Sequence, residues 1–196
     1  MNKTELVAEI VNRFEDHPII FTTGFASRIA FALRPRASNH FYMVGSMGMA
    51  SAVGRGIVAQ LDSRSRYPVI VDGDGAMLMG IHCLLLEQET PGSILHIIAN
   101  DGSYSSTGSQ EVPSSSAAIC GMASAAGYGL IRQLRTPELN LDESLSAARF
   151  TVLAGSSALL NCHVQAGPEP LGRIDLPLPD IARQFQTFAA NQSPRG

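Results

Sequence analysis

Two apolar runs, each ending in a glycine-rich turn with a polar oxygen, constrain the fold of this chain most. The first covers residues 68–71 and leads into Gly73-Asp74-Gly75; the second covers Ile94 to Ala99 and leads into Asn100-Asp101-Gly102. Short continuous apolar runs are typical of strands buried on both faces of a parallel sheet. Because adjacent parallel strands end at one edge of a sheet, we expect Asp74 and Asn100 to lie close together there.

The chemistry at this predicted edge favours a metal-bound phosphate ester. A carboxylate, an amide oxygen and a nearby backbone carbonyl suit Mg²⁺ or Ca²⁺. The turn at Gly73 and Gly75 leads into a predicted helix from Met77 to Glu89, and free N–H groups at a helix start favour an anion such as a diphosphate. The alternative is two ordinary strand–helix turns in which Asp74 and Asn100 only cap helices.

The rest of the chain alternates short apolar runs with helical patterns. Further strands are expected at residues 19–23, 41–44, 130–134 and 157–164, and further helices at 2–14, 27–33, 45–56, 117–126, 141–150 and from 178 onwards. Strands that alternate with helices indicate an α/β fold with a mainly parallel sheet. We expect one domain over residues 1–191 and a flexible tail over 192–196.

Composition excludes several classes of protein. The chain has 196 residues, of which 45% are hydrophobic and 16% charged, with a net charge of −3, so neither a nucleic-acid nor a membrane-surface partner is indicated. No apolar run is long enough to cross a membrane, and the N-terminal segment does not resemble a signal peptide. The isolated Cys83, Cys120 and Cys162 are interpreted as reduced core residues of a cytoplasmic protein.

The histidines show no metal-ligand spacing, and the chain has no Ser-His-Asp context, Walker loop or zinc motif. His96 and His163 lie inside apolar runs and are interpreted as buried neutral residues. His82 is interpreted as a packed helix histidine in preference to a catalytic acid.

The two turns together resemble the cofactor motif of thiamine diphosphate enzymes. Gly73-Asp74-Gly75, 24 intervening residues and Asn100 match that family's GDG, some two dozen residues and N, although Ala99 stands where many members carry a first Asn. The resemblance implies a three-layer sandwich that binds thiamine diphosphate and Mg²⁺. It assigns the metal to Asp74, Asn100 and the Gly102 carbonyl. It assigns the cofactor to a wider set: Gly45, Ser46, Met47, Gly73, Asp74, Gly75, Ala76, Asn100, Gly102, Ser103 and Tyr104.

A second signature, Gly45-Ser46-Met47-Gly48, resembles the family's G-x-M-G before a small-residue helix. The resemblance implies that the Gly45 carbonyl faces the aminopyrimidine and that Met47 wedges between the two cofactor rings, so both residues set the cofactor conformation for catalysis. Methionine is adaptable enough for such a wedge. Without the resemblance, Met47 would be interpreted as a core methionine.

Four stretches are similar to sulfopyruvate decarboxylase beta subunits and phosphonopyruvate decarboxylases: residues 23–28, 41–48, 73–79 and 101–110. The chain departs from that pattern at Ile29, where an acidic residue is usual, and at His82, where Gly is usual. The resemblance implies decarboxylation of 3-sulfopyruvate or 3-phosphonopyruvate to the aldehyde and CO₂.

The polar loop after Asn100 is a candidate for contact with the substrate. Its hydroxyl and amide groups suit an oxyanion such as a sulfonate, phosphonate or carboxylate, and Ser105, Ser106, Thr107 and Gln110 are the candidates. The alternative is a solvated connector. Arg28, Arg55 and Arg173 are possible anion partners, although each is more commonly a surface arginine.

Thiamine diphosphate enzymes bind their cofactor between two domains, and this chain has room for one. The resemblance implies that a separate alpha-type subunit supplies the pyrimidine domain and its catalytic Glu, in an αβ or α₂β₂ assembly. Glu87, Glu89 and Glu111 lie on the wrong predicted elements for that role. Two alternatives stay open: a carboligase subunit like that of acetolactate synthase, and a non-catalytic regulatory subunit that binds a diphosphate.

Overall fold

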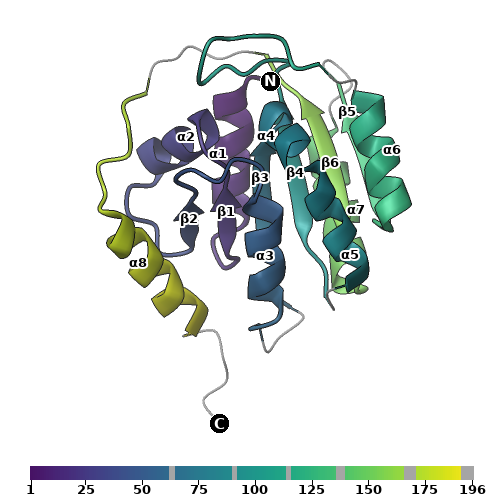
Figure 1. The fold of residues 1–196 in the computed structure, drawn as a ribbon. Coiled ribbons are helices and arrows are strands. Elements are labelled where there is room, and N and C mark those ends of the chain that lie inside the picture. The colour runs from purple at the N-terminus through teal and green to yellow at the C-terminus, as the bar shows by residue number, and fades with distance from the viewer. Residues whose placement is uncertain (62–64, 90–91, 114–115, 136–139, 166–170, 191–196) are drawn as a thin grey trace.

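The computed structural model describes residues 1–61, 65–89, 92–113, 116–135, 140–165 and 171–190, and the predicted tail at 192–196 lies outside these ranges. One sheet forms the centre, and helices cover both of its faces (Figure 1). Its strands are β1 (Ile19–Phe21), β2 (His40–Tyr42), β3 (Val69–Gly73), β4 (Leu95–Asn100), β5 (Leu130–Leu134) and β6 (Ala158–His163).

The helices lie where the amphipathic patterns place them, with two exceptions described below. They are α1 (Lys3–Arg13), α2 (Phe25–Leu33), α3 (Ala50–Val58), α4 (Asp74–Met79), the 3₁₀ segment η1 (Ile81–Leu85), α5 (Leu86–Glu89), α6 (Ser116–Ala126), α7 (Leu141–Leu153) and α8 (Leu178–Ala190). None of the helices in the described ranges is both long enough and apolar enough to cross a membrane.

The strand order is β2-β1-β3-β4-β6-β5, and every pairing is parallel, which confirms the predicted parallel sheet. In the central pair, Gly73 of β3 is in register with Ala99 of β4. The residues that follow these two positions, Asp74 and Asn100, therefore leave the sheet side by side at its carboxyl edge.

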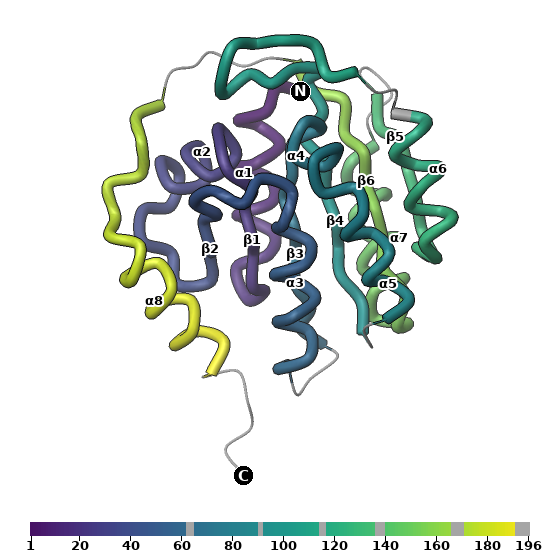
Figure 2. The backbone as a smooth tube through the Cα atoms, in the orientation of Figure 1, coloured from purple at the N-terminus to yellow at the C-terminus, as the bar shows by residue number. Residues whose placement is uncertain are grey.

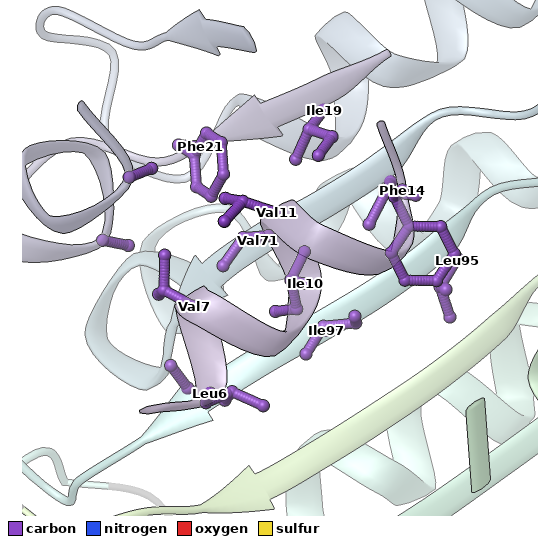
Figure 3. Close-up of a cluster of buried hydrophobic side chains, with 14 of the residues drawn as sticks. Leu6, Val7, Ile10, Val11, Phe14, Ile19, Phe21, Val71, Leu95 and Ile97 are labelled. Atoms are coloured by element: carbon purple, nitrogen blue, oxygen red, sulfur yellow. The ribbon is translucent and has the colours of Figure 1, made fainter. Parts of the chain in front are cut away.

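Two apolar layers enclose the sheet and confirm the three-layer sandwich. On one face, Leu6, Val7, Ile10 and Val11 of α1 pack against sheet residues that include Ile19, Phe21, Val71, Leu95 and Ile97, all of them buried (Figure 3). α2 and α7 extend this layer. On the other face, α3, α6 and α8 cover side chains such as Ile70 and Ile98. Burial of these apolar side chains is the main stabilising contribution to the fold.

The single helix predicted from Met77 to Glu89 is wrong. The chain forms α4, η1 and α5 in succession, with the first break at Gly80. A Cβ atom at Gly80 would lie 1.8 Å from the Gly48 carbonyl oxygen, so the two backbones touch at this point. Local helical periodicity contains no information about this contact, because Gly48 belongs to a distant segment.

The helix predicted over residues 45–56 is also wrong at its start, because α3 begins only at Ala50. Before it, φ is 74° at Gly45, 49° at Ser46 and 91° at Gly48, so this segment is a loop in left-handed conformations. Glycine adopts these angles without strain. The loop carries Met47 toward the carboxyl edge of the sheet, where it lines a cavity beside Asp74.

Candidate functional site

Asp74 and Asn100 lie together at the carboxyl ends of β3 and β4, and both are buried. The Gly102 N–H donates to Asp74 Oδ2 over 2.7 Å and to Asn100 Oδ1 over 3.2 Å. The Gly75 N–H donates to Asp74 Oδ1 over 3.0 Å. Side-chain oxygens from two neighbouring strands therefore point at one place, as the spacing in the sequence predicts.

Asn161 of β6 determines which end of the Asn100 carboxamide faces Asp74. Asn100 Nδ2 donates to Asn161 Oδ1 over 3.1 Å, and Asn161 is fully buried. The nitrogen of Asn100 is thereby held toward β6, which leaves its oxygen on the side of Asp74 and Gly102. Asn161 was not predicted as a site residue, although a polar residue inside the apolar run 157–164 indicates a buried hydrogen-bonding role.

The pKa of Asp74 is raised above the ordinary aspartate value, first because the side chain is buried and then because Asp101 lies nearby. The N–H groups of Gly75 and Gly102 and the charge of Lys3 act in the opposite direction. A buried carboxylate whose ionised form is disfavoured is stabilised by a bound cation.

Residues 101–112 fold into a compact loop that passes over the carboxyl ends of the strands, beside the N-terminus (Figure 1). The Val112 N–H donates to the Gly102 carbonyl and the Tyr104 N–H to the Gln110 carbonyl, each over 2.9 Å. The Gly102 carbonyl, which is predicted to be a metal ligand, thus also accepts a hydrogen bond within the loop.

The loop packs directly on the turns below it. A Cβ atom at Gly75 would lie 2.4 Å from Tyr104 Cε1, so the Tyr104 ring lies against the turn after β3. A Cβ atom at Gly24, whose φ is 102°, would lie 2.9 Å from Ser106 Oγ. Glycine is needed at both positions because any side chain would push the loop away.

Lys3 fixes this loop to α1. Its Nζ lies 2.7 Å from Asp101 Oδ2 and 3.1 Å from Ser105 Oγ, and Lys3 is 7% exposed. A buried lysine normally needs such partners, since its charge is costly to remove from water. Lys3 was not predicted as a site residue, because its place in a helix-capping segment is typical of a surface residue.

A cavity of about 40 Å³ lies between this loop, the turn after β3 and the loop that carries Met47. We call it the turn cavity. The predicted site residues that line it are Met47, Gly73, Asp74, Gly75, Ala76, Ser103, Tyr104, Ser105 and Ser106. Lys3, Thr22 and Thr23 line it as well and were not predicted as site residues.

Apart from Asn100 and Gly102, which lie beside Asp74, the remaining predicted residues lie away from the turn cavity. Gly45 lines a second cavity, whereas Ser46 is exposed and lines neither. Thr107 and Gln110 are exposed on the outer part of the loop, and Thr107 Oγ1 donates to the Tyr104 carbonyl over 3.1 Å. The structure thus brings two of the four substrate candidates, Ser105 and Ser106, to the turn cavity.

Both departures from the family pattern lie away from the turn cavity. Ile29 of α2 is 1% exposed and belongs to the apolar layer between α2 and the sheet, where an acidic side chain would be buried among apolar ones. His82 is exposed in η1 with its Nε2 3.6 Å from Cys83 Sγ, so the prediction of a packed helix histidine is wrong.

The residues at the turn suit a hard cation and a diphosphate. Asp74 and Asn100 supply one carboxylate and one amide oxygen, and Mg²⁺ is bound in proteins by few such ligands together with phosphate oxygens. Among the described residues, no group of three or more His, Cys, Asp or Glu side chains could hold a metal ion. A site built from one carboxylate, one amide and one carbonyl does not require such a group.

Residues 22–151 match the family model described as thiamine pyrophosphate enzyme, C-terminal TPP binding domain. The matched region contains the turn after β3, Asn100 and the loop above them.

Two named relatives align with most of this chain. It is 33% identical over 178 residues to phosphonopyruvate decarboxylase of Streptomyces hygroscopicus, covering 90% of this chain and 42% of the relative. It is 30% identical over 186 residues to sulfopyruvate decarboxylase subunit beta of Methanothermobacter thermautotrophicus, covering 94% of each chain. The chain thus spans less than half of the Streptomyces enzyme and nearly all of the archaeal subunit.

A solved structure supports the fold. The thiamine diphosphate-dependent 4-hydroxybenzoylformate decarboxylase of Rhodococcus jostii superposes with a TM-score of 0.62 at 19% identity, over 86% of this chain and 33% of that one. The family match over residues 22–151 and the 30% identity to the archaeal subunit over 94% of both chains show that this chain belongs to the thiamine pyrophosphate enzyme family and carries its C-terminal TPP-binding domain.

Proposed function

We propose that this chain is the cofactor-binding, beta-type subunit of a decarboxylase that converts 3-sulfopyruvate or 3-phosphonopyruvate to the aldehyde and CO₂. The observation that carries the proposal is the convergence of Asp74 Oδ2 and Asn100 Oδ1 on the Gly102 N–H at the ends of two adjacent strands. The names of the relatives support the choice of substrates.

In this proposal Asp74, Asn100 and the Gly102 carbonyl hold Mg²⁺, and the N–H groups of Gly75 and Ala76 bind the diphosphate. Met47, presented by its loop, keeps the cofactor rings in position. Bound thiamine diphosphate supplies the electron sink that loss of CO₂ from a 2-oxo acid requires. Asn161 keeps the Asn100 oxygen turned toward the metal, in the way that outer-shell partners orient metal ligands.

The loop over the turn would keep water out of the site. Tyr104 lies against Gly75, and the ion pair of Lys3 with Asp101 fastens the loop to α1. Removing water strengthens every electrostatic interaction inside the site. Lys3 also lowers the pKa of Asp74, which favours the ionised form that binds a metal.

The proposal includes a partner that supplies the pyrimidine domain and its Glu, in an αβ or α₂β₂ assembly. The chain covers 94% of a relative named subunit beta but 42% of a relative that bears no subunit name, which supports a split enzyme. Glu87, Glu89 and Glu111 line neither cavity. Their absence from both cavities supports a Glu supplied by the partner.

An assay of the purified assembly tests the proposal. The protein, isolated with the subunit that copurifies with it, is supplied with thiamine diphosphate and Mg²⁺ and then with sulfopyruvate, phosphonopyruvate or pyruvate. We expect CO₂ and the matching aldehyde from one of the first two acids. Acetolactate from pyruvate, with no aldehyde from the other acids, would instead support the carboligase alternative.

A further inference from the structure

A second cavity, of about 300 Å³, lies beside the turn cavity and shares Thr23 with it. We call it the edge cavity, because it lies at the β2 edge of the sheet. Gly45 lines it, so it borders the residue whose carbonyl is proposed to face the cofactor ring. This volume is within the range of small-molecule sites.

Two distant parts of the chain form its walls. One wall comes from the start of α2 and the end of β2, and the other from residues 173–181. Figure 2 shows the C-terminal segment descending along the β2 edge into α8. The packing of Leu176 and Ile181 into the apolar layer and of Phe185 against Phe41, with ring centroids 5.4 Å apart, holds this wall in place.

One arginine from each wall lines the edge cavity, Arg28 and Arg173. Neither forms an ion pair with a carboxylate in the ranges that the structure describes. Arg28 Nη1 donates to the Leu171 carbonyl over 3.3 Å, and its guanidinium lies 5.3 Å from the centre of the Phe25 ring. These contacts hold Arg28 against the C-terminal segment without neutralising its charge.

The remaining lining is largely apolar, with Met43, Val44 and Leu178 among its members. Arg173, Val44 and Leu178 are exposed, so the cavity is open to solvent, and its two positive charges draw anions toward it. Guanidinium groups also match the geometry of tetrahedral oxyanions through paired N–H donors. A small acid with a second, tetrahedral acidic group at one end satisfies these requirements better than a monocarboxylate.

We propose that the edge cavity is the subsite for the sulfonate or phosphonate group of the substrate, with Arg28 and Arg173 as the residues that distinguish a doubly charged 2-oxo acid from pyruvate. This inference rests on the proposed function for the position of the reacting carbon. The cavity's two arginines and its position beside the turn cavity, with Thr23 lining both, do not depend on that function.

Binding of sulfoacetate tests the subsite without any turnover. Calorimetric titration of the copurified assembly, with acetate as the singly charged comparison, is carried out on the wild type and on Arg28→Gln, Arg173→Gln and Arg183→Gln. Arg183 is exposed on α8 and lines neither cavity, so it is the matched control. We expect Arg28→Gln and Arg173→Gln to weaken sulfoacetate binding about 10- to 100-fold, the usual range for a lost charged hydrogen bond.

Arg173→Gln is the decisive variant, because Arg28 also bonds the Leu171 carbonyl and its loss could displace the wall. Equal sulfoacetate binding by the wild type and Arg173→Gln, or no binding by the wild type, would overturn the subsite.

Kinetics separate the subsite from the proposed function. In Arg28→Gln and Arg173→Gln, kcat/KM for sulfopyruvate or phosphonopyruvate should fall about 10- to 100-fold, whereas Arg183→Gln should keep the wild-type value. If the wild type decarboxylates either acid and the variants are unchanged, the subsite is wrong and the proposed function stands. If the wild type decarboxylates neither but binds sulfoacetate through both arginines, the subsite stands and the reaction is wrong.

Discussion

At the scale of single residues, some side chains of the site could be predicted from the sequence and others could not. Asp74 and Asn100 follow two apolar runs at a recognisable spacing, so their meeting could be predicted. Asn161 is recognisable as a polar residue in an apolar run, but its partner, like that of Lys3, could not be identified, because the contacts join residues 61 and about 100 positions apart. Long-range partners of this kind leave no periodic signal.

Asn161→Leu should weaken metal-dependent cofactor binding about 10- to 100-fold, the range for outer-shell partners of metal ligands. Leucine has a similarly branched but larger side chain that cannot accept the hydrogen bond from Asn100 Nδ2, so the Asn100 carboxamide would be free to turn. Mg²⁺ titration at fixed thiamine diphosphate measures the change. Asn161→Asp keeps an acceptor and should retain more of the affinity. Wild-type affinity in Asn161→Leu would show that Asn161 does not orient Asn100.

At the scale of elements, the strands followed the predicted pattern closely, whereas the helices around the site did not. The break between α4 and η1 and the loop before α3 meet at one point, where the Gly48 and Gly80 backbones are in contact. That contact is absent from any local pattern. It positions the Met47 loop beside the turn after β3.

Gly80→Ala should therefore destabilise the protein by about 1–3 kcal/mol, the usual cost of forcing extra volume into a packed region. The new methyl group would meet the Gly48 carbonyl at 1.8 Å, so the Met47 loop must shift. Gly56→Ala in α3 is the control, since a Cβ atom there meets nothing within 4 Å. We expect it to stabilise the helix by about 0.5–1 kcal/mol. Urea unfolding measures the stability of both variants. Equal stabilities of Gly80→Ala and Gly56→Ala would contradict the close contact between Gly48 and Gly80.

The edge strand β2 carries a pH-dependent contribution to stability. His40 is buried, with Nδ1 3.0 Å from the Tyr42 hydroxyl, and burial lowers its pKa to about 4 from the ordinary 6.5. The unfolded chain therefore binds a proton more readily than the folded one between these two values. Stability should fall as pH drops from 6.5 to 4, by on the order of 3 kcal/mol from this group.

His40→Phe removes the titrating group and keeps a ring against Phe21, whose centroid lies 5.1 Å from that of His40. Urea unfolding at a series of pH values should give a shallower loss of stability below pH 6.5 in this variant than in the wild type. Parallel pH profiles for the two proteins would rule out His40 as the source.

At the scale of the whole molecule, the parallel three-layer architecture was predictable because it follows from alternating strands and helices. The C-terminal segment was predictable only as a helix. Its docking against the β2 edge, through Phe185 and Phe41, creates the edge cavity and brings Arg173 to the same cavity as Arg28. Such docking depends on packing between residues far apart in the chain, which a single sequence does not reveal.

Mg²⁺-dependent binding of thiamine diphosphate to the copurified assembly is the measurement that tests the central claim most directly. Calorimetry compares the wild type, Asp74→Asn and the control Asp142→Asn, whose carboxylate is 76% exposed. The wild type and the control should bind the cofactor only with Mg²⁺.

Asp74→Asn should bind at least about 100-fold more weakly, because even outer-shell changes cost 10- to 100-fold. The variant should stay folded without cofactor, since asparagine keeps one of the two oxygens that accept from the Gly75 and Gly102 N–H groups, and the burial that raises the pKa of Asp74 disfavours its charge. Wild-type, Mg²⁺-dependent binding by Asp74→Asn would contradict the account, and so would cofactor binding by the wild type that does not depend on Mg²⁺.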